Sequence, residues 1–360
     1  MEDEGDLFFD YDVNCTGNMS MHEDCEGPLP ITSFAKARII LYIISFLLSL
    51  IGNSCVVLVT LKKIYKKVNV GAFKLLIAHL ALVDFLYSCN IFVLIPNELY
   101  EAEMHDRLPM CTFKRLLRQA PYMASIGTVV VIAIERFKSI SHDFSVRKWS
   151  KRRICVSLLI VWVVSFAVYI PETISLDTRD GDIHCYKKMN LTQIRANAVF
   201  LLLMEYVLPL CIIGFCNYKV IAVIKSRQML GLQTQNMQER DNEQKKSVRI
   251  LLAIVIGFAV LALPNQIFFG YLDLGNNYHE FTKKWDILQM IAIILLFHAS
   301  FNAVLYSVVD KDFRCDVKEL CCCCFEKFTL SRDRSSISTS ATGVNSKAYE
   351  MTDVNINSSA

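Results

Sequence analysis

The amino-acid sequence predicts an all-α membrane protein: a seven-transmembrane helix bundle with a short amphipathic membrane-surface helix after the seventh span. Of its 360 residues, 53% are hydrophobic and only 20% are charged, whereas globular domains carry about 25% charged residues. Seven apolar segments approach or exceed the roughly 20 residues that a helix needs to cross a bilayer. Because a segment in lipid must satisfy its own backbone hydrogen bonds, each segment is expected to be helical.

The seven segments follow one another between residues 39 and 309 and divide the chain into four expected regions. They are residues 39–61, 71–96, 119–134, 154–171, 196–218, 250–272 and 287–309. The regions are an acidic, glycosylated extracellular tail (1–35), the seven-transmembrane bundle (36–309), the amphipathic helix with a cysteine cluster (310–324) and a disordered cytoplasmic tail (325–360).

The distribution of basic residues predicts the orientation of the bundle. Lysine and arginine are concentrated in the loops after the first, third and fifth segments, and loops of this kind stay in the cytoplasm. We therefore expect a multi-pass plasma-membrane protein with its amino terminus extracellular and its carboxyl terminus cytoplasmic. The glycosylation acceptors Asn14, Asn18 and Asn190 all fall on the expected outer side. Residues 226–244 are expected to form a flexible loop.

The extracellular tail is strongly acidic. Residues 1–26 contain nine acidic residues and no lysine or arginine, so this segment is too charged to fold alone. Such a tail either steers a basic ligand toward the bundle or is simply a solvated, glycosylated end. Cys15 and Cys25 could close a small loop within it.

Asp84 is an acidic residue in the predicted membrane interior. It lies 13 residues after Gly71, which at 1.5 Å per residue places it about 20 Å along the helix, near the bilayer centre. An ionisable group at that depth commonly marks function. We expect either a sodium or proton site inside the bundle, with Ser125, His298 and Asn302 as companions, or a buried acid held by a neighbouring polar group.

The order and spacing of several short motifs resemble those of the rhodopsin-like (class A) G-protein-coupled receptors, of the peptide-receptor type. Each motif alone is weak, but together they extend over residues 52–313. They are Gly52-Asn53, Leu80-x-x-x-Asp84, Glu135-Arg136-Phe137, Trp162, Pro209, Phe258, Pro264, Asn302-Ala303-x-x-Tyr306 and Phe313.

The resemblance implies roles for particular residues. It implies that Arg136, beside Glu135, holds the inactive state and later meets a heterotrimeric G protein; the alternative is an arginine that extends to the lipid interface. It implies a disulfide between Cys111 and Cys185. It also implies that arrestin and receptor kinases act on the cytoplasmic side. The activation residues implied by the family are Glu135, Arg136, Phe258, Pro264, Asn302 and Tyr306.

The sequence departs from the family pattern in its predicted activation core. Ala262 replaces the family tryptophan, Ala303 replaces a proline, and His298 replaces an asparagine of the sodium site. These changes keep open an atypical decoy receptor that internalises its ligand without G-protein signalling. His298 is expected either to pair with Asp84 and make activation respond to pH, or to be a neutral histidine hydrogen-bonded in the core.

The pocket positions favour a peptide ligand. Leu296 replaces the lysine that retinal requires, and Arg118 replaces the aspartate of amine receptors. Arg118 and Glu205 either pair with each other or contact opposite charges on the ligand. We expect a neuropeptide or other peptide, with a small non-peptide ligand as the alternative. The ligand-binding residues that the resemblance implies, at positions matching the family's pocket, are Arg118, Gln119, Tyr122, Glu205, Asn265, Gln266, Phe269 and Gln289.

The chain after the seventh segment is expected to lie at the cytoplasmic membrane surface. Residues 310–320 alternate charged with apolar positions, as in a helix that lies on a bilayer. The adjacent Cys321, Cys322, Cys323 and Cys324 are expected to be palmitoylated; a metal site is the alternative, but adjacent cysteines lack ligand spacing. Serines and threonines beyond Phe325 suggest phosphorylation, or a plain disordered end.

Other classes of function are not expected. The sequence has no metal-ligand cluster, nucleophile motif or phosphate-binding loop, so we do not expect an enzyme. The inverted repeats and broken helices of transporters are not evident. A net charge of +3 gives no reason to expect a nucleic-acid partner.

Overall fold

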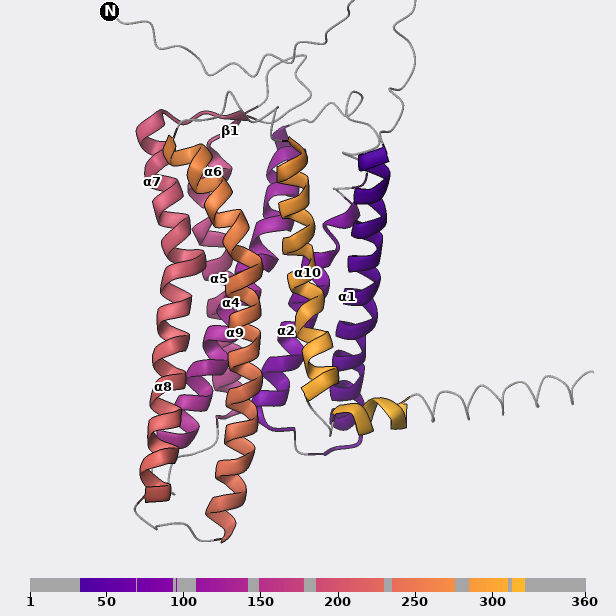
Figure 1. Cartoon of the computed structure of the whole chain (residues 1–360), viewed down its shortest axis with the longest axis vertical. Helices are drawn as coiled ribbons and strands as arrows, with labels where there is room; N and C mark the ends of the chain where they lie inside the picture. Colours follow the sequence, from indigo (N-terminus) through magenta and orange to yellow (C-terminus); the bar gives the residue numbers. More distant parts are fainter. Residues whose placement is uncertain are drawn as a thin grey trace, which may run out of the picture. The chain divides into compact units, whose positions relative to one another are not determined.

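The computed structural model describes residues 33–68, 70–92, 95, 108–141, 149–177, 186–229, 235–275, 285–309 and 313–320. The part of the chain up to Phe313 is a compact unit of long, side-by-side helices (Figure 1). The first four are α1 (Ser33–Tyr65), α2 (Ala72–Ser88), α4 (Leu108–Ser141) and α5 (Lys151–Val168).

The second half of the bundle begins with a short helix and a small hairpin. The short helix α6 (Ile170–Ile174) leads into β1 (Leu176–Asp177), which pairs antiparallel with β2 (Tyr186–Lys187). The remaining elements are α7 (Leu191–Leu202), the short π-helix η1 (Leu203–Val207), α8 (Leu208–Met229), α9 (Gln235–Gly275) and α10 (Trp285–Val309). Residues 313–320 are also helical.

Five helical stretches of the described chain are long and apolar enough to cross a membrane. They are Ala35–Tyr65, Arg115–Ile140, Lys151–Ile174, Leu191–Met229 and Lys245–Gly275. Helix α2 has 17 residues, and the apolar stretch Met290–Leu305 of α10 is also shorter than these five. The all-α architecture expected from the sequence is therefore confirmed in its coarse form.

Three helix boundaries differ from the sequence-based expectation. Helix α2 ends at Ser88 rather than near residue 96, and a turn at residues 89–90 separates it from Ile91, Phe92 and Ile95, which are again helical. At this turn Ser88 and Asn90 donate side-chain hydrogen bonds to the carbonyls of Phe85 and Tyr87. The fifth segment is divided by η1. The loop expected at 226–244 is shorter, because α8 continues to Met229 and α9 begins at Gln235.

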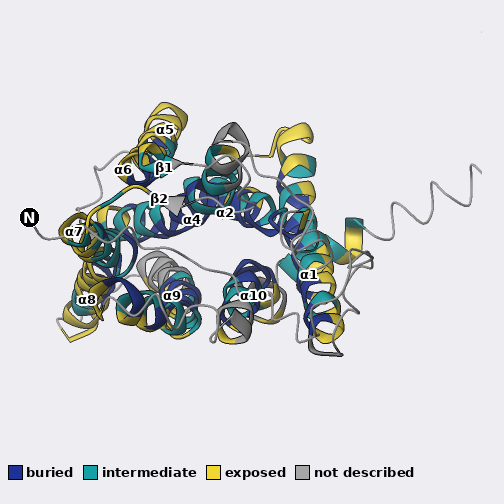
Figure 2. Ribbon diagram, turned by 90° about the horizontal axis from the view of Figure 1, so that it is seen from above, coloured by how far each residue is buried: buried dark blue, intermediate teal, exposed yellow. Residues whose placement is uncertain are grey.

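The helices enclose a common core with α4 near its centre. Helix α4 packs against α2, α5, α8 and α9, while α1 packs against α2 and α10. Figure 2 shows buried residues on the inward faces of the helices and exposed residues on the outward faces. The outward faces are apolar, with Ile51, Leu159 and Val260 each more than 60% exposed. Outward apolar faces are suited to lipid rather than water.

The two ends of the bundle carry different features. We call the end with α6, β1 and β2 the hairpin end, and the opposite end, where α4 finishes after Glu135 and Arg136, the Arg136 end. Two close contacts between helices depend on glycine. A Cβ atom on Gly52 of α1 would lie 2.6 Å from Cβ of Ala303, and one on Gly257 of α9 would overlap the ring of Phe301.

Candidate ligand-binding site

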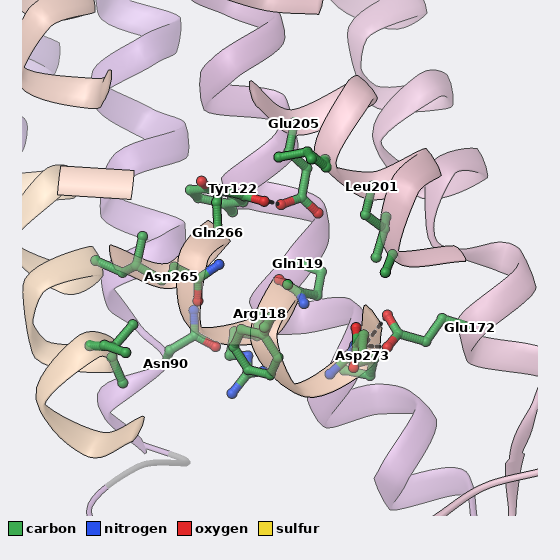
Figure 3. A pocket seen from close by; sticks show the side chains of 18 of the residues that line it. Asn90, Arg118, Gln119, Tyr122, Glu172, Leu201, Glu205, Asn265, Gln266 and Asp273 are labelled. Atoms are coloured by element: carbon green, nitrogen blue, oxygen red, sulfur yellow. Dashed lines mark hydrogen bonds and ion pairs between the residues drawn. The ribbon is translucent and has the colours of Figure 1, made fainter. Parts of the chain in front are cut away.

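A cavity of about 180 Å³ opens between the helices in the hairpin half of the bundle. Its walls come from α2, α4, α6, α7, η1, α9 and α10 (Figure 3). The lining is mixed, with charged and amide side chains beside apolar ones such as Leu201, Leu295 and Phe269. A concave site with an apolar wall and a few convergent polar groups is the usual form of a ligand site.

The structure brings together seven of the eight residues that the sequence assigned to the ligand pocket. The side chain of the eighth, Gln289, lies outside the described part of the chain. The seven that line the cavity are Arg118, Gln119, Tyr122, Glu205, Asn265, Gln266 and Phe269. These residues come from three separate elements, α4, η1 and α9, which converge on one space.

The cavity also contains an ion pair that sequence reasoning missed. Arg115 Nε donates to Glu172 Oε2 at 3.1 Å, and Arg115 Nη2 contacts Glu172 Oε1, so the guanidinium binds both carboxylate oxygens. The Glu172 side chain is only 1% exposed. This pair ties α6 to α4. A usable signal was present, because Arg115 and Arg118 are three residues apart and share a helix face.

Arg118 and Glu205 do not pair with each other among the described residues. Glu205 instead accepts hydrogen bonds from the Tyr169 hydroxyl at 2.8 Å and from Gln266 Nε2 at 3.1 Å. Its position in the π-turn η1 directs this acid, only 6% exposed, toward α5 and α9. π-turns are often found at functional sites.

A second polar cluster surrounds Asp84 deeper in the bundle. Ser125 Oγ donates to Asp84 Oδ1 at 2.6 Å, and Asn302 Nδ2 donates to Asp84 Oδ2 at 2.7 Å. Asn53 Nδ2 donates to Ser49 Oγ and to the carbonyl of Ala299, which extends the cluster to α1 and α10. Both carboxylate oxygens of the fully buried Asp84 therefore have protein donors.

His298 does not form the ion pair with Asp84 that was one of its two expected states. Its ring packs edge-on against Phe258, with centroids 5.5 Å apart, and against Tyr122, at 6.4 Å. The hydrogen bond of the other expected state is not formed with any described residue, although His298 is buried in the core. Its described contacts are therefore aromatic packing contacts.

The residues at the Arg136 end form a smaller charged site. Arg136 Nε lies 2.6 Å from Glu135 Oε2, and the guanidinium lies over the ring of Phe73, 4.5 Å from its centroid.

Phe258 is buried between Tyr122 and Tyr206, and Pro264 lies inside α9. The side chain of Tyr306 lies outside the described residues.

Several other predicted sites fall wholly or partly outside the described chain. Asn14, Asn18, Cys185 and the four cysteines Cys321, Cys322, Cys323 and Cys324 lie outside it, as does the side chain of Cys111. Asn190 is described and exposed at the start of α7. There its side chain accepts a hydrogen bond from the Gln193 backbone, and the Gln193 side chain accepts one from Asn190 N.

A bundle of helices with apolar outward faces around a polar cavity is the architecture of a membrane protein with an internal binding site. The family model described as 7 transmembrane receptor (rhodopsin family) matches residues 18–306, and the chain belongs to this family. Membership confirms the sequence-based identification. It also establishes a multi-pass plasma-membrane receptor rather than an enzyme.

The chain is similar to receptors whose names refer to peptides. A neuropeptide Y receptor type 1 of Xenopus laevis is 28% identical over 85% of this chain and 86% of that receptor. A QRFP-like peptide receptor of Branchiostoma floridae is 28% identical over 77% and 75%. A substance-P receptor of Meriones unguiculatus is 24% identical over 79% and 70%.

Proposed function

We propose that this protein binds an extracellular peptide in the cavity around Arg118 and activates a heterotrimeric G protein through the Arg136 end. The observation that carries the proposal is the cavity itself, in which seven predicted ligand-contacting residues converge. Its amide and charged side chains suit the repeated hydrogen-bonding groups of a peptide. The peptide names of the similar receptors support the same ligand class.

The proposed orientation places the hairpin end outside the cell and the Arg136 end in the cytoplasm. The basic loops predict it, and the exposed Asn190, beside the hairpin, would then be available for glycosylation together with Asn14 and Asn18. The proposed seven spans comprise the five long stretches plus α2 and α10. The acidic tail of residues 1–26 would steer a basic ligand to the same face.

A disulfide between Cys111 and Cys185 is proposed at the hairpin end. Cys111 belongs to the first turn of α4, Cys185 directly precedes Tyr186 of β2, and β1 packs against α4. Tying the hairpin to α4 in this way would constrain a loop of about 75 residues and stabilise the unliganded cavity.

The cytoplasmic features are proposed from the sequence and the family. Residues 313–320 would lie on the membrane as an amphipathic helix, with palmitoyl chains on Cys321, Cys322, Cys323 and Cys324. The serines and threonines beyond Phe325 would be phosphorylated by receptor kinases and then bound by arrestin. The decoy alternative is less favoured because Glu135 and Arg136, the proposed G-protein contact, are present and paired.

Asp84 is proposed as a proton or sodium site, with Ser125 and Asn302 as companions. Two protein donors already reach its carboxylate, so a cation would have to share these oxygens, whereas a proton would need no extra space. His298 would act through its packing on Phe258 rather than as a direct ligand.

The experiment expresses the full chain in cells and screens a peptide library with a G-protein dissociation assay and a ligand-uptake assay in parallel. We expect at least one peptide to cause dissociation. The Arg136→Ala variant should keep peptide binding and lose dissociation, while the exposed Arg152→Ala serves as the matched control and behaves as wild type. Peptide uptake without dissociation in the wild type would establish the decoy alternative instead.

A further inference from the structure

Three polar groups in the cavity lining have bonding capacity that the described part of the chain does not use. Arg118 forms no ion pair or hydrogen bond with a described residue. The hydroxyl of Tyr122 and Oδ1 of Asn90 have no hydrogen-bond partner among the described residues, although each residue is only 3% exposed. Buried polar groups are normally paired, and an unpaired one needs an explanation.

The other charges around the cavity already have partners. Arg115 is paired with Glu172, and Glu205 accepts bonds from Tyr169 and Gln266. Asp273 also has an interaction of its own. The guanidinium of Arg118 is therefore the cation in this lining that is available to a ligand.

The three unused groups define a particular ligand chemistry. A guanidinium recognises a carboxylate through two parallel hydrogen bonds. The amide oxygen of Asn90 accepts an N–H, because its Nδ2 already donates to the carbonyl of Tyr87. The Tyr122 hydroxyl, four residues along α4 from Arg118, adds a further donor or acceptor. A carboxylate and an adjacent N–H occur together in the last residue of a peptide with a free carboxyl end.

The size of the cavity agrees with a terminal residue rather than a long segment. Its 180 Å³ would hold about six water molecules at ~30 Å³ each. Sites that enclose a drug-sized ligand have volumes of about 300–1,000 Å³. The apolar wall formed by Leu201, Leu295 and Leu296 would contact an apolar terminal side chain.

We propose that the cavity binds the carboxyl-terminal residue of a peptide ligand that ends in a free carboxylate. The carboxylate pairs with Arg118, and the last backbone N–H donates to Oδ1 of Asn90. This inference rests on the proposed function for the peptide nature of the ligand. It narrows that function to peptides with an unmodified carboxyl end and an apolar last residue.

The test measures thermal stabilisation of the purified full-length receptor by small probes of the terminal residue. N-acetyl-L-leucine carries the carboxylate and the N–H, while N-acetyl-L-leucinamide lacks the charge. We expect the acid to bind about tenfold more tightly than the amide, since charge-assisted hydrogen bonds are the stronger ones. The O-acetyl derivative of the corresponding 2-hydroxy acid keeps the free carboxylate but has an ester oxygen in place of the amide N–H. It should bind about fivefold more weakly than N-acetyl-L-leucine.

Variants assign the preference to Arg118. Arg118→Gln should remove the difference between acid and amide, and Arg118→Lys should keep part of it, because the charge is retained but not the fork geometry. Arg152→Gln, the same change at an exposed site on α5, should keep the full difference. If Arg118→Gln fails to fold, the comparison of probes on the wild type still decides the question.

Several outcomes would overturn the inference. These are equal stabilisation by acid and amide, no stabilisation by either up to their solubility limits, or a preference that survives in Arg118→Gln. N-acetyl-L-glutamate α-amide has its carboxylate on the side chain. If it binds more tightly than N-acetyl-L-leucine, the cavity recognises an acidic side chain instead of a terminal carboxylate. A peptide agonist equally potent as acid and amide would remove this inference while leaving the peptide-receptor function intact.

Discussion

The bundle contains two polar regions that differ in whether their charged group is paired. Around Asp84, both carboxylate oxygens have protein donors from other helices, although Oδ1 of Asn53 and Oδ1 of Asn302 have no hydrogen-bond partner among the described residues. Around Arg118, the guanidinium, Tyr122 Oη and Asn90 Oδ1 have no hydrogen-bond partner in the described part of the chain. The charged group of the first region joins helices, whereas that of the second is available to a ligand. An unpaired charge, rather than polarity itself, distinguishes the candidate site.

The largest expected effect comes from breaking the ion pair at the edge of the cavity. Arg115→Ala should lower the free energy of unfolding by about 3–5 kcal/mol, because it leaves the carboxylate of Glu172 buried without its ion-pair partner. Glu172→Ala should cost less, since the Arg115 side chain is 20% exposed and that of Glu172 is 1% exposed.

Thermal unfolding of the two single variants and of the double variant Arg115→Met, Glu172→Leu tests this order. The double variant should recover most of the loss, as replacement of a buried pair by apolar residues often does. A double variant as unstable as Arg115→Ala would show that the pair is not the source of the effect.

The next effect tests whether the Asp84 cluster is structural. Ser125→Ala should lower the free energy of unfolding by about 1–3 kcal/mol, because it leaves a buried carboxylate oxygen without a donor. Ser165→Ala is the matched control, because this buried serine donates only to a carbonyl of its own helix, that of Val161. Equal melting temperatures for the two variants would contradict a structural role for Ser125.

Two tyrosines in the same half of the bundle give a smaller and more direct contrast. Tyr169→Phe should cost about 1–2 kcal/mol, because the hydroxyl donates to Glu205 at 2.8 Å. Tyr122→Phe removes a hydroxyl that has no hydrogen-bond partner in the described part of the chain, so the unliganded protein should be unchanged or slightly more stable. The difference between their melting temperatures is the measurement, and a reversed order would remove the distinction between used and unused bonds.

The smallest effect is expected at Arg118. Arg118→Gln should change the stability of the unliganded receptor by no more than about 0.5 kcal/mol, because the guanidinium has no ion pair with a described residue to lose. A large loss in melting temperature without ligand would show that Arg118 is held by the protein itself.

Much of the fold and of the cavity could be predicted from the sequence. Apolar length identified the helices, and the resemblance to the receptor family assigned Arg118, Gln119 and Tyr122 to the ligand pocket. The pairing of charges could not be predicted in the same way. From the sequence, Arg118 could pair either with Glu205 or with the ligand, and Arg115 was assigned no role. Which arginine pairs with an acid depends on how α6, which carries Glu172, docks against α4.

The polar core shows the same limit. The sequence predicted Asp84, Ser125 and Asn302 as neighbours, and the structure places them in hydrogen-bond contact. The state of His298 was not predicted, because packing of its ring on Phe258 depends on the rotation of α10 relative to α9. The turn at residues 89–90, where Ser88 and Asn90 bond to carbonyls of the preceding turn, was also missed, since hydropathy does not report local side-chain hydrogen bonds.

The π-turn η1 has a consequence for how this receptor could change its ligand during evolution. A π-turn holds more residues than an α-turn, so loss of one residue within Leu203–Val207 would leave a continuous α-helix. A deletion inside a regular α-helix turns everything beyond it by about 100°, but the extra residue of a π-turn is absorbed within the turn. Such a deletion would therefore leave α7 and α8 on their present faces and change the cavity wall mainly around Glu205. A one-codon change in gene length could thus alter the acidic part of the cavity without repacking the bundle.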